Sequence, residues 1–172
     1  MNGPAHSSPL TIRAAAIGDL PAIVAIYNEA VQQRFATADL EPVTVEQRSA
    51  WFHEHDPARL PIYVAERDGA ILGWCSLSAH RPGRAALIGT SEISYYVRAD
   101  SRRHGIGSAL VRHAIDDARR LGKRVLFGIL LEKNTASISL LRTCGFELWG
   151  RLPDAALIEG ELVSHVYYGR KV

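Results

Sequence analysis

Cysteine is scarce in this sequence. Cys75 and Cys144 are the only two among 172 residues, far apart in the chain and without a partner pattern. Such usage is typical of a reduced, intracellular protein rather than of a disulfide scaffold, and it predicts a cytoplasmic location. No apolar run approaches the length of a membrane-spanning helix. The first ten residues lack the apolar core of a signal peptide, so we expect residues 1–9 to form a flexible leader.

An excess of either charge is also missing. The 20 basic and 18 acidic side chains give a formal net charge of +2, which excludes a strong footprint for nucleic acid or for a membrane surface. The seven histidines show no metal-ligand spacing. His53 and His55 are two residues apart and would point to different faces of a helix. The sequence therefore predicts no catalytic metal, no nucleic-acid partner and no membrane partner.

What is present suits one globular domain over residues 10–172. With 47% apolar and 22% charged residues, the chain has the ordinary composition of a globular protein with a sizeable core. The hydrophobic patterns predict the order β-α-α-β-β-β-α-β-α-β-β. Hairpin signals such as Asp68-Gly69 alternate with strand–helix units. We therefore expect an α/β (α+β) fold, with a single mixed central sheet of about seven strands flanked by helices on both faces.

The most informative stretch runs from Ser91 to Gly122. SEISYYV (91–97) is rich in β-branched and aromatic residues and predicts a strand. RADSRRHGIG (98–107) is a basic loop with two glycines, and the apolar spacing that follows predicts an amphipathic helix closed by Gly122. A helix N-terminus with nearby arginines suits a pyrophosphate group. The alternative is an ordinary strand-to-helix turn with solvated arginines.

The spacing inside this loop is distinctive. Arg102-x-x-Gly105-x-Gly107 lacks the G-x-G-x-x-G of a dinucleotide site and the Gly-Lys-Ser/Thr of a P-loop. It resembles the acetyl-CoA signature of the GCN5-related N-acetyltransferases (GNAT), whose fold matches the predicted element order. IYVAERDGAILGWCSLS, RRHGIGSAL and EKNTASISLLRTCGFE further resemble the phosphinothricin and methionine sulfoximine acetyltransferases. The resemblance covers about residues 10 to 170.

That resemblance implies an acyltransferase that moves acetyl from acetyl-CoA to the primary amine of a small amino acid or amino-acid analogue, within a ternary complex and as a homodimer. Acetyl-CoA is the co-substrate, and its pantetheine arm is expected to run alongside the central strand. The implied cofactor-binding residues are Tyr95, Tyr96, Val97, Arg102, Arg103, His104, Gly105, Ile106, Gly107, Ser108, Asn134, Ser137 and Thr143. For Asn134 and Ser137 the alternative is a plain helix cap.

Glu92 is the candidate catalytic base. A carboxylate within an apolar strand is costly when it is buried without a partner, so we expect it to face a cleft or water. Strand alternation places Glu92, Ser94 and Tyr96 on one face and Ile93, Tyr95 and Val97 on the other. Desolvation would also raise the pKa of Glu92 toward a range useful for proton transfer. A structural salt bridge is the alternative.

The sequence also offers candidates for a substrate pocket and for a proton donor. The candidate substrate-binding residues are Tyr27, Phe35, Trp74, Ser76, Arg81 and Arg84, and the two arginines are expected to hold a carboxylate. Leu141 stands where many relatives carry a Tyr or His that protonates the leaving thiolate. Tyr96, His165 and Tyr167 are alternative donors.

Two other functions stay open. A protein or peptide N-terminal acetyltransferase on the same fold would need an open groove instead of a closed pocket. A non-catalytic acetyl-CoA-binding protein is favoured by Leu141 but opposed by the retained Glu92.

Overall fold

A computed structural model gives the fold and describes residues 8–172, so most of the expected leader lies outside the described residues. One mixed sheet has the strand order β1-β2-β3-β4-β5-β7-β6. The strands are β1 (Thr11–Ala14), β2 (Ile62–Arg67), β3 (Ala70–Ala79), β4 (Thr90–Val97), β5 (Val125–Leu131), β6 (Glu147–Ile158) and β7 (Glu161–Lys171). The helices are α1 (Leu20–Gln32), α2 (Val45–His53), α3 (Ile106–Ala118) and α4 (Thr135–Thr143). The predicted element order and single mixed sheet are confirmed.

Local sequence signals explain several of these boundaries. Thr44 caps α2 by accepting a hydrogen bond from the Gln47 amide, and the Gln47 side chain accepts one from the Thr44 amide in return. Asp68 and Gly69 both adopt positive φ, 51° and 75°, as a tight turn between β2 and β3 requires. Gly122, with φ +70°, ends the turn that follows α3.

The last hairpin differs from the sequence prediction. The sequence predicts one turn at Pro153-Asp154 and a second at Glu159-Gly160. The second is confirmed, but β6 continues through the first pair to Ile158. The register between β6 and β7 shifts between Leu152 and Ala156, which marks an irregularity in the ladder. Because β6 is an edge strand, a proline there costs no ladder hydrogen bond on its open side.

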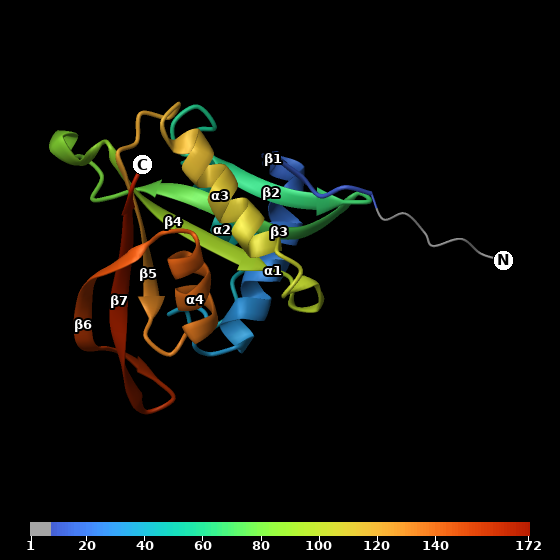
Figure 1. The fold of residues 1–172 in the computed structure, drawn as a ribbon. Coiled ribbons are helices and arrows are strands. Elements are labelled where there is room, and N and C mark those ends of the chain that lie inside the picture. The colour runs from blue at the N-terminus through green and yellow to red at the C-terminus, as the bar shows by residue number, and fades with distance from the viewer. Residues whose placement is uncertain (1–7) are drawn as a thin grey trace.

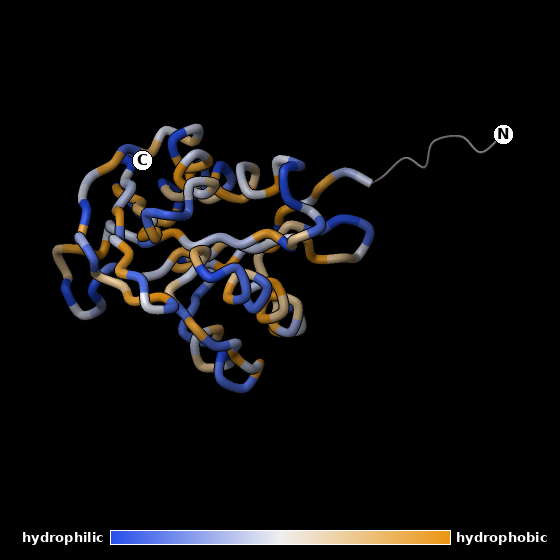
Figure 2. Tube along the Cα trace, turned by 90° about the horizontal axis from the view of Figure 1, so that it is seen from below, coloured by the Kyte–Doolittle hydropathy of each residue, from blue (hydrophilic) through white to orange (hydrophobic). Residues whose placement is uncertain are grey.

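Helices cover the sheet on both faces (Figure 1). One core cluster joins α3 and α4 to the sheet, and it includes Leu77, Ile93, Leu110 and Leu141. A second cluster joins α1 to β2 and β3. In Figure 2 many of the most hydrophilic segments lie at outer turns of the chain. Within residues 8–172, no helix combines the length and the apolar character that crossing a membrane requires.

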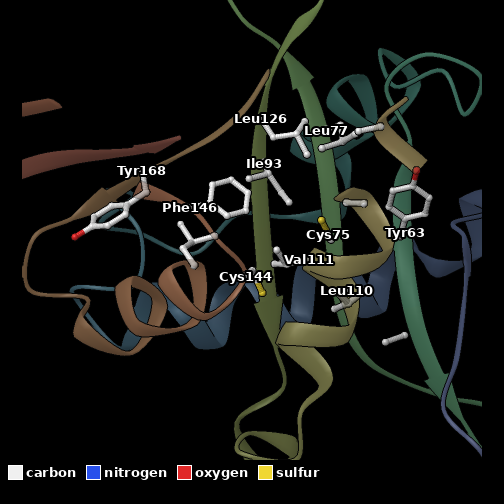
Figure 3. Close-up of a cluster of buried hydrophobic side chains, with 14 of the residues drawn as sticks. Tyr63, Cys75, Leu77, Ile93, Leu110, Val111, Leu126, Cys144, Phe146 and Tyr168 are labelled. Atoms are coloured by element: carbon white, nitrogen blue, oxygen red, sulfur yellow. The ribbon is translucent and has the colours of Figure 1, made fainter. Parts of the chain in front are cut away.

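The two cysteines belong to the first of these clusters. Cys75 and Cys144 are both buried free thiols that lie on different elements, as Figure 3 shows. Burial raises the pKa of the Cys75 thiol well above its ordinary value. Both residues therefore act as small core side chains, and neither is poised as a nucleophile.

The centre of the sheet is split. β4 pairs with β3 along Ser91–Val97, but it pairs with the parallel strand β5 only over Thr90–Glu92. Beyond Glu92 the two strands diverge, and Figure 1 shows them separating as the halves of a V. Residues 93–97 therefore have a strand partner on one side only. The gap between β4 and β5 begins at Glu92, the candidate catalytic base.

Candidate active site

The polar face of β4 lines a cavity of about 450 Å³. Glu92, Ser94 and Tyr96 all line it, whereas Ile93 belongs to the core cluster beneath α3 and α4. Tyr95 and Val97 pack against the same cluster. The alternation predicted from the sequence is thus confirmed, and the polar face of this strand looks into a cavity on the side of α1 and α2.

Glu92 lies on the floor of this cavity. Its register partner on β3 is Ser78, which lines the cavity too, and its partner on β5 is Phe127. Burial raises the pKa of the Glu92 carboxyl, with no neighbouring charge contributing to the shift. A carboxylate held in this way accepts a proton more readily than a solvated one, which is what a general base requires.

Aromatic rings form the wall of the cavity. Tyr96 lies edge-on to Tyr27, with ring centroids 5.0 Å apart, and its ring centroid lies 4.8 Å from that of Trp74. The ring centroids of Trp51 and Trp74 lie 5.6 Å apart. The Trp74 indole donates a hydrogen bond to the Ile23 carbonyl at 3.0 Å, so this ring is fixed in place by α1. Such rigid aromatic walls beside polar groups suit the binding of a small polar molecule.

Arg48 of α2 is a cavity residue that the sequence analysis missed. Its guanidinium carbon lies 4.4 Å from the centroid of the Tyr27 ring. One of its nitrogens lies 3.5 Å from an Asp39 carboxylate oxygen, and the Tyr27 hydroxyl donates to the same carboxylate at 2.5 Å. Arg48 precedes Trp51 by three residues, so the two share a helix face. That spacing was the only available signal.

His55, which follows α2, contacts the cavity-lining residue Ser78. Its Nδ1 lies 2.7 Å from the Trp51 carbonyl oxygen, and its Nε2 lies 3.2 Å from the Ser78 hydroxyl. Because a carbonyl oxygen only accepts hydrogen bonds, Nδ1 carries the proton and Nε2 accepts from Ser78 in the neutral ring. Burial lowers the pKa of His55, which favours that neutral form. The lone pairs of the Ser78 oxygen remain for the cavity.

The basic loop leads into α3 with strained backbone geometry. Gly105 caps the helix with φ +78°, and Arg103 also adopts a positive φ of 62°. The Arg102 side chain donates to the Val97 carbonyl at 3.0 Å, which ties the loop to the end of β4. A Cβ at position 107 would lie 2.8 Å from a Leu140 methyl. The helix N-terminus, with Gly105 exposed and the backbone closely packed at Gly107, fits the diphosphate of a coenzyme A group.

The other predicted cofactor residues lie on or near α4. Asn134 caps this helix by accepting from the Ser137 amide at 3.2 Å. The Tyr95 hydroxyl donates to the Ser137 carbonyl at 3.2 Å, and the Thr143 hydroxyl donates to the Ser139 carbonyl. The structure therefore contains the Asn134 cap that the sequence offered as an alternative. A coenzyme contact by Asn134, Ser137 or Thr143 remains a prediction.

The structure does not bring the predicted substrate residues together. Tyr27, Trp74 and Ser76 line the cavity with Glu92. Phe35 lies outside its lining and packs with the ammonium of Lys133, 4.9 Å from the ring centroid. Arg81 and Arg84 line a second cavity, formed largely by the loop between β3 and β4. Sequence spacing alone could not show which cavity each loop residue enters.

The possible proton donors also separate. Leu141 is fully buried in the core, His165 and Tyr96 line the cavity, and Tyr167 stacks on Phe127 outside it. Burial raises the pKa of Tyr96 far above its ordinary value, so its hydroxyl keeps its proton. Among residues 8–172, no three His, Cys, Asp or Glu side chains gather so as to hold a metal ion.

Comparison with known proteins assigns the fold and the site to a family. The acetyltransferase (GNAT) family model matches residues 22–146. The L-methionine sulfoximine/L-methionine sulfone acetyltransferase of Pseudomonas aeruginosa is 40% identical over 145 residues, which are 84% of each chain. A phosphinothricin acetyltransferase from Sinorhizobium meliloti, solved in complex with AcCoA, has a TM-score of 0.89 and 29% identity, with 95% of this chain and 88% of that one covered.

A third similar structure is of a protein named for a different activity. It is a ribosomal-protein-alanine N-acetyltransferase from Brucella melitensis, with a TM-score of 0.88 and 34% identity over 94% of this chain and 99% of that one. The chain therefore belongs to the GNAT family of acetyltransferases. It is an N-acetyltransferase that uses acetyl-CoA, as the sequence analysis expected.

Proposed function

We propose that this enzyme acetylates the primary amine of a small amino acid or amino-acid analogue, in the manner of phosphinothricin or methionine sulfoximine. The single observation that carries the proposal is the cavity of about 450 Å³ that joins the Glu92 carboxylate to aromatic walls and to Arg48. A cavity of this size holds a small molecule. The names of the similar proteins agree with this substrate class.

Glu92 would accept the proton of the substrate ammonium group. The free amine then has the lone pair that attacks a thioester carbonyl carbon, and the raised pKa of Glu92 suits this transfer. Ser78 stands opposite Glu92, with its hydroxyl proton directed to His55. Its oxygen can therefore accept an N–H of the amine and orient it. Both groups act from the same side of the cavity.

Acetyl-CoA supplies the acetyl group as an activated thioester. The residues of this chain would bind it along the unpaired edge of β4, at Tyr95, Tyr96 and Val97, and at the loop from Arg102 to Ser108. The split between β4 and β5 leaves room for an extended arm. A backbone N–H near Tyr96 or Val97 would stabilise the negative charge that develops on the carbonyl oxygen.

The leaving thiolate has two candidate proton donors in the cavity. Leu141 provides no proton, whereas Tyr96 and His165 both line the cavity with Glu92. Tyr96 is the better placed of the two, since it lies on β4 next to the expected coenzyme edge and keeps its hydroxyl proton. A thiolate is also a competent leaving group without protonation.

Arg48 would hold the carboxylate of the amino-acid substrate. Its planar guanidinium has five N–H donors, and the contact with Asp39 uses only part of them. It lies over the Tyr27 ring and lines the same cavity as Glu92. We therefore assign to Arg48 the carboxylate contact that the sequence analysis had given to Arg81 and Arg84.

A homodimer in the cytoplasm completes the proposal. Large apolar side chains gather on the β6–β7 hairpin, where they are 46% to 61% exposed: Leu148, Trp149, Leu152, Leu157 and Leu162. An exposed apolar patch of this kind marks a protein interface, and a second copy of the chain is the partner that we propose for it. The two buried free thiols agree with a reducing compartment.

The proposal is tested by thiol release from acetyl-CoA in the presence of amino acids, their sulfoximine and sulfone analogues, decarboxylated amines and short peptides. We expect turnover with one class of small amino acid. Arg48→Ala should raise KM for that substrate about 10- to 100-fold, because one charge-assisted contact is lost. Arg112→Ala, which removes an exposed cation on α3, is the matched control.

Three results would contradict this proposal. Equal KM values for the amino acid and its decarboxylated amine would remove the carboxylate contact. Turnover on peptides alone would favour the protein acetyltransferase, the activity for which one similar protein is named. Tight acetyl-CoA binding without turnover on any amine would favour the non-catalytic alternative.

A further inference from the structure

A second cavity, of about 320 Å³, lies at the end of the sheet where β4 begins. The loop between β3 and β4 contributes most of its lining, and the segments before β2 and β5 close it with Arg59 and Lys123. The basic loop at Arg102–Gly107 follows the other end of β4. This cavity is thus separated from the expected coenzyme loop by the length of the strand, and its lining shares no residue with the Glu92 cavity.

Four basic side chains line this second cavity: Arg59, Arg81, Arg84 and Lys123. Among the described residues of its lining there is no Asp or Glu. Within residues 8–172, none of the four takes part in a salt bridge, whereas Arg13, Arg98, Arg120 and Arg151 all pair with carboxylates elsewhere. Like charges that converge without a counterion repel one another, and their repulsion is relieved by a bound anion.

Lys123 makes the absence of a counterion costly. Its exposed fraction is only 8%, and its one polar contact is the Ile88 carbonyl oxygen, 3.5 Å from Nζ. A buried ammonium normally pairs with an acid or binds a ligand, because an uncompensated charge loses its hydration without return. Burial and the charge of Arg59 together lower the pKa of Lys123, which is the response expected of an ammonium that lacks an anionic partner.

We propose that the second cavity is an oxyanion-binding site, in which Lys123, Arg59, Arg81 and Arg84 hold a phosphate, sulfate or carboxylate group. Arg59 and the two loop arginines offer planar N–H pairs that match such a group, and Lys123 adds a point charge. Arg81 adopts a positive φ of 50°, so the loop backbone is held in a conformation that non-glycine residues rarely adopt. A bound oxyanion would tie this loop to the start of β5.

Inorganic phosphate is the probe for this site, and the protein is first saturated with coenzyme A so that the Arg102–Gly107 loop is filled. Phosphate is titrated calorimetrically at constant ionic strength, with chloride as the reference anion. We expect saturable binding with one site per chain. Arg59→Ala should weaken phosphate binding at least about tenfold, since one charge-assisted contact is removed. Arg112→Ala, which removes one exposed charge away from this lining, should leave it unchanged.

The unfolding temperature of Lys123→Met provides a second test. Without phosphate, this variant should unfold at a higher temperature than the wild type, because an unpaired buried charge is replaced by an apolar side chain. With phosphate, the wild type should gain thermal stability and the variant should gain little. Equal phosphate shifts in the wild type, Lys123→Met and Arg59→Ala would overturn the proposal, as would a chloride effect as large as that of phosphate.

The source of the oxyanion is distinguished by kinetics. If phosphate raises KM for the amine substrate without changing kcat, the site holds an acidic group of that substrate. If KM is unchanged while phosphate binds, the site holds a separate anion. The binding titration needs no turnover, so a failure of the proposed acetylation would leave the oxyanion site testable on its own.

Discussion

The two faces of β4 carry opposite kinds of side chain and serve opposite purposes. Glu92 faces a cavity, and burial raises its pKa, so ionisation of this carboxyl weakens the folded state. Ile93, the next residue, is 3% exposed and packs in the core beneath α3 and α4. One strand thus places a destabilising functional group directly beside a stabilising one, and the core face fixes the position of the site face.

The largest effect on this comparison is expected from Glu92→Gln, which keeps the shape of the side chain and removes its basicity. We expect kcat/KM for the amine to fall about 10²- to 10⁴-fold, the usual range for loss of a general base. In the wild type, kcat/KM should fall as pH drops through the raised pKa of Glu92, because the protonated carboxyl accepts no proton. The rate of thiol release, measured against pH, checks both.

The same variant should be more stable than the wild type at neutral pH. The folded pKa of Glu92 lies above its unfolded value, so the wild type loses stability as pH rises through the folded pKa. Below about pH 4 the carboxyl is protonated in both states, and the stability difference due to ionisation should vanish. An unchanged kcat/KM in Glu92→Gln would remove this residue from the mechanism and erase the distinction between the two faces.

Ile93→Ala probes the opposite face and should give the next largest effect. Figure 3 shows Ile93 among Leu77, Leu126 and Phe146 in the core. Truncation to alanine is expected to lower the free energy of unfolding by about 2–5 kcal/mol, measured in urea, because it removes buried methyl groups and leaves a cavity. Ser94→Ala, one position further and on the cavity face, should change it by less than about 0.5 kcal/mol. Similar losses in both variants would contradict the alternation.

Much of this architecture was predictable because it depends on local physics. The alternation of β4, the Thr44 capping box, the Asp68-Gly69 turn and the helix that opens at Gly105 each follow from a few neighbouring residues. The extension of β6 through Pro153 did not, because a proline ends a strand or not according to whether the strand lies at an edge. Edge position is a property of the whole sheet.

The site was predictable in part for the same reason. Glu92 could be assigned to a cleft because an unpartnered carboxylate in an apolar strand is costly wherever it lies. Only its spacing to Trp51 distinguishes Arg48 in the sequence, whereas Arg81 and Arg84 lie in the loop that precedes Glu92. In the structure Arg48 lines the cavity of Glu92, because α2 places it over the Tyr27 ring. The β3–β4 loop places Arg81 and Arg84 in the second cavity instead. Only tertiary structure contains that information.

The smallest effect that sharpens the comparison is expected from Tyr95→Phe. Tyr95 points to the core side of β4, where its hydroxyl donates to the Ser137 carbonyl on α4 at 3.2 Å. Loss of this one hydrogen bond should lower the free energy of unfolding by about 1 kcal/mol, measured in urea with an unchanged slope. Tyr167→Phe is the matched change on a ring that stacks on Phe127, and it should alter stability by less than about 0.5 kcal/mol. If both variants are equally stable, the Tyr95 hydroxyl contributes nothing to the docking of α4. Packing of the apolar face of β4 against α3 and α4 would then hold this strand in place without the hydrogen bond.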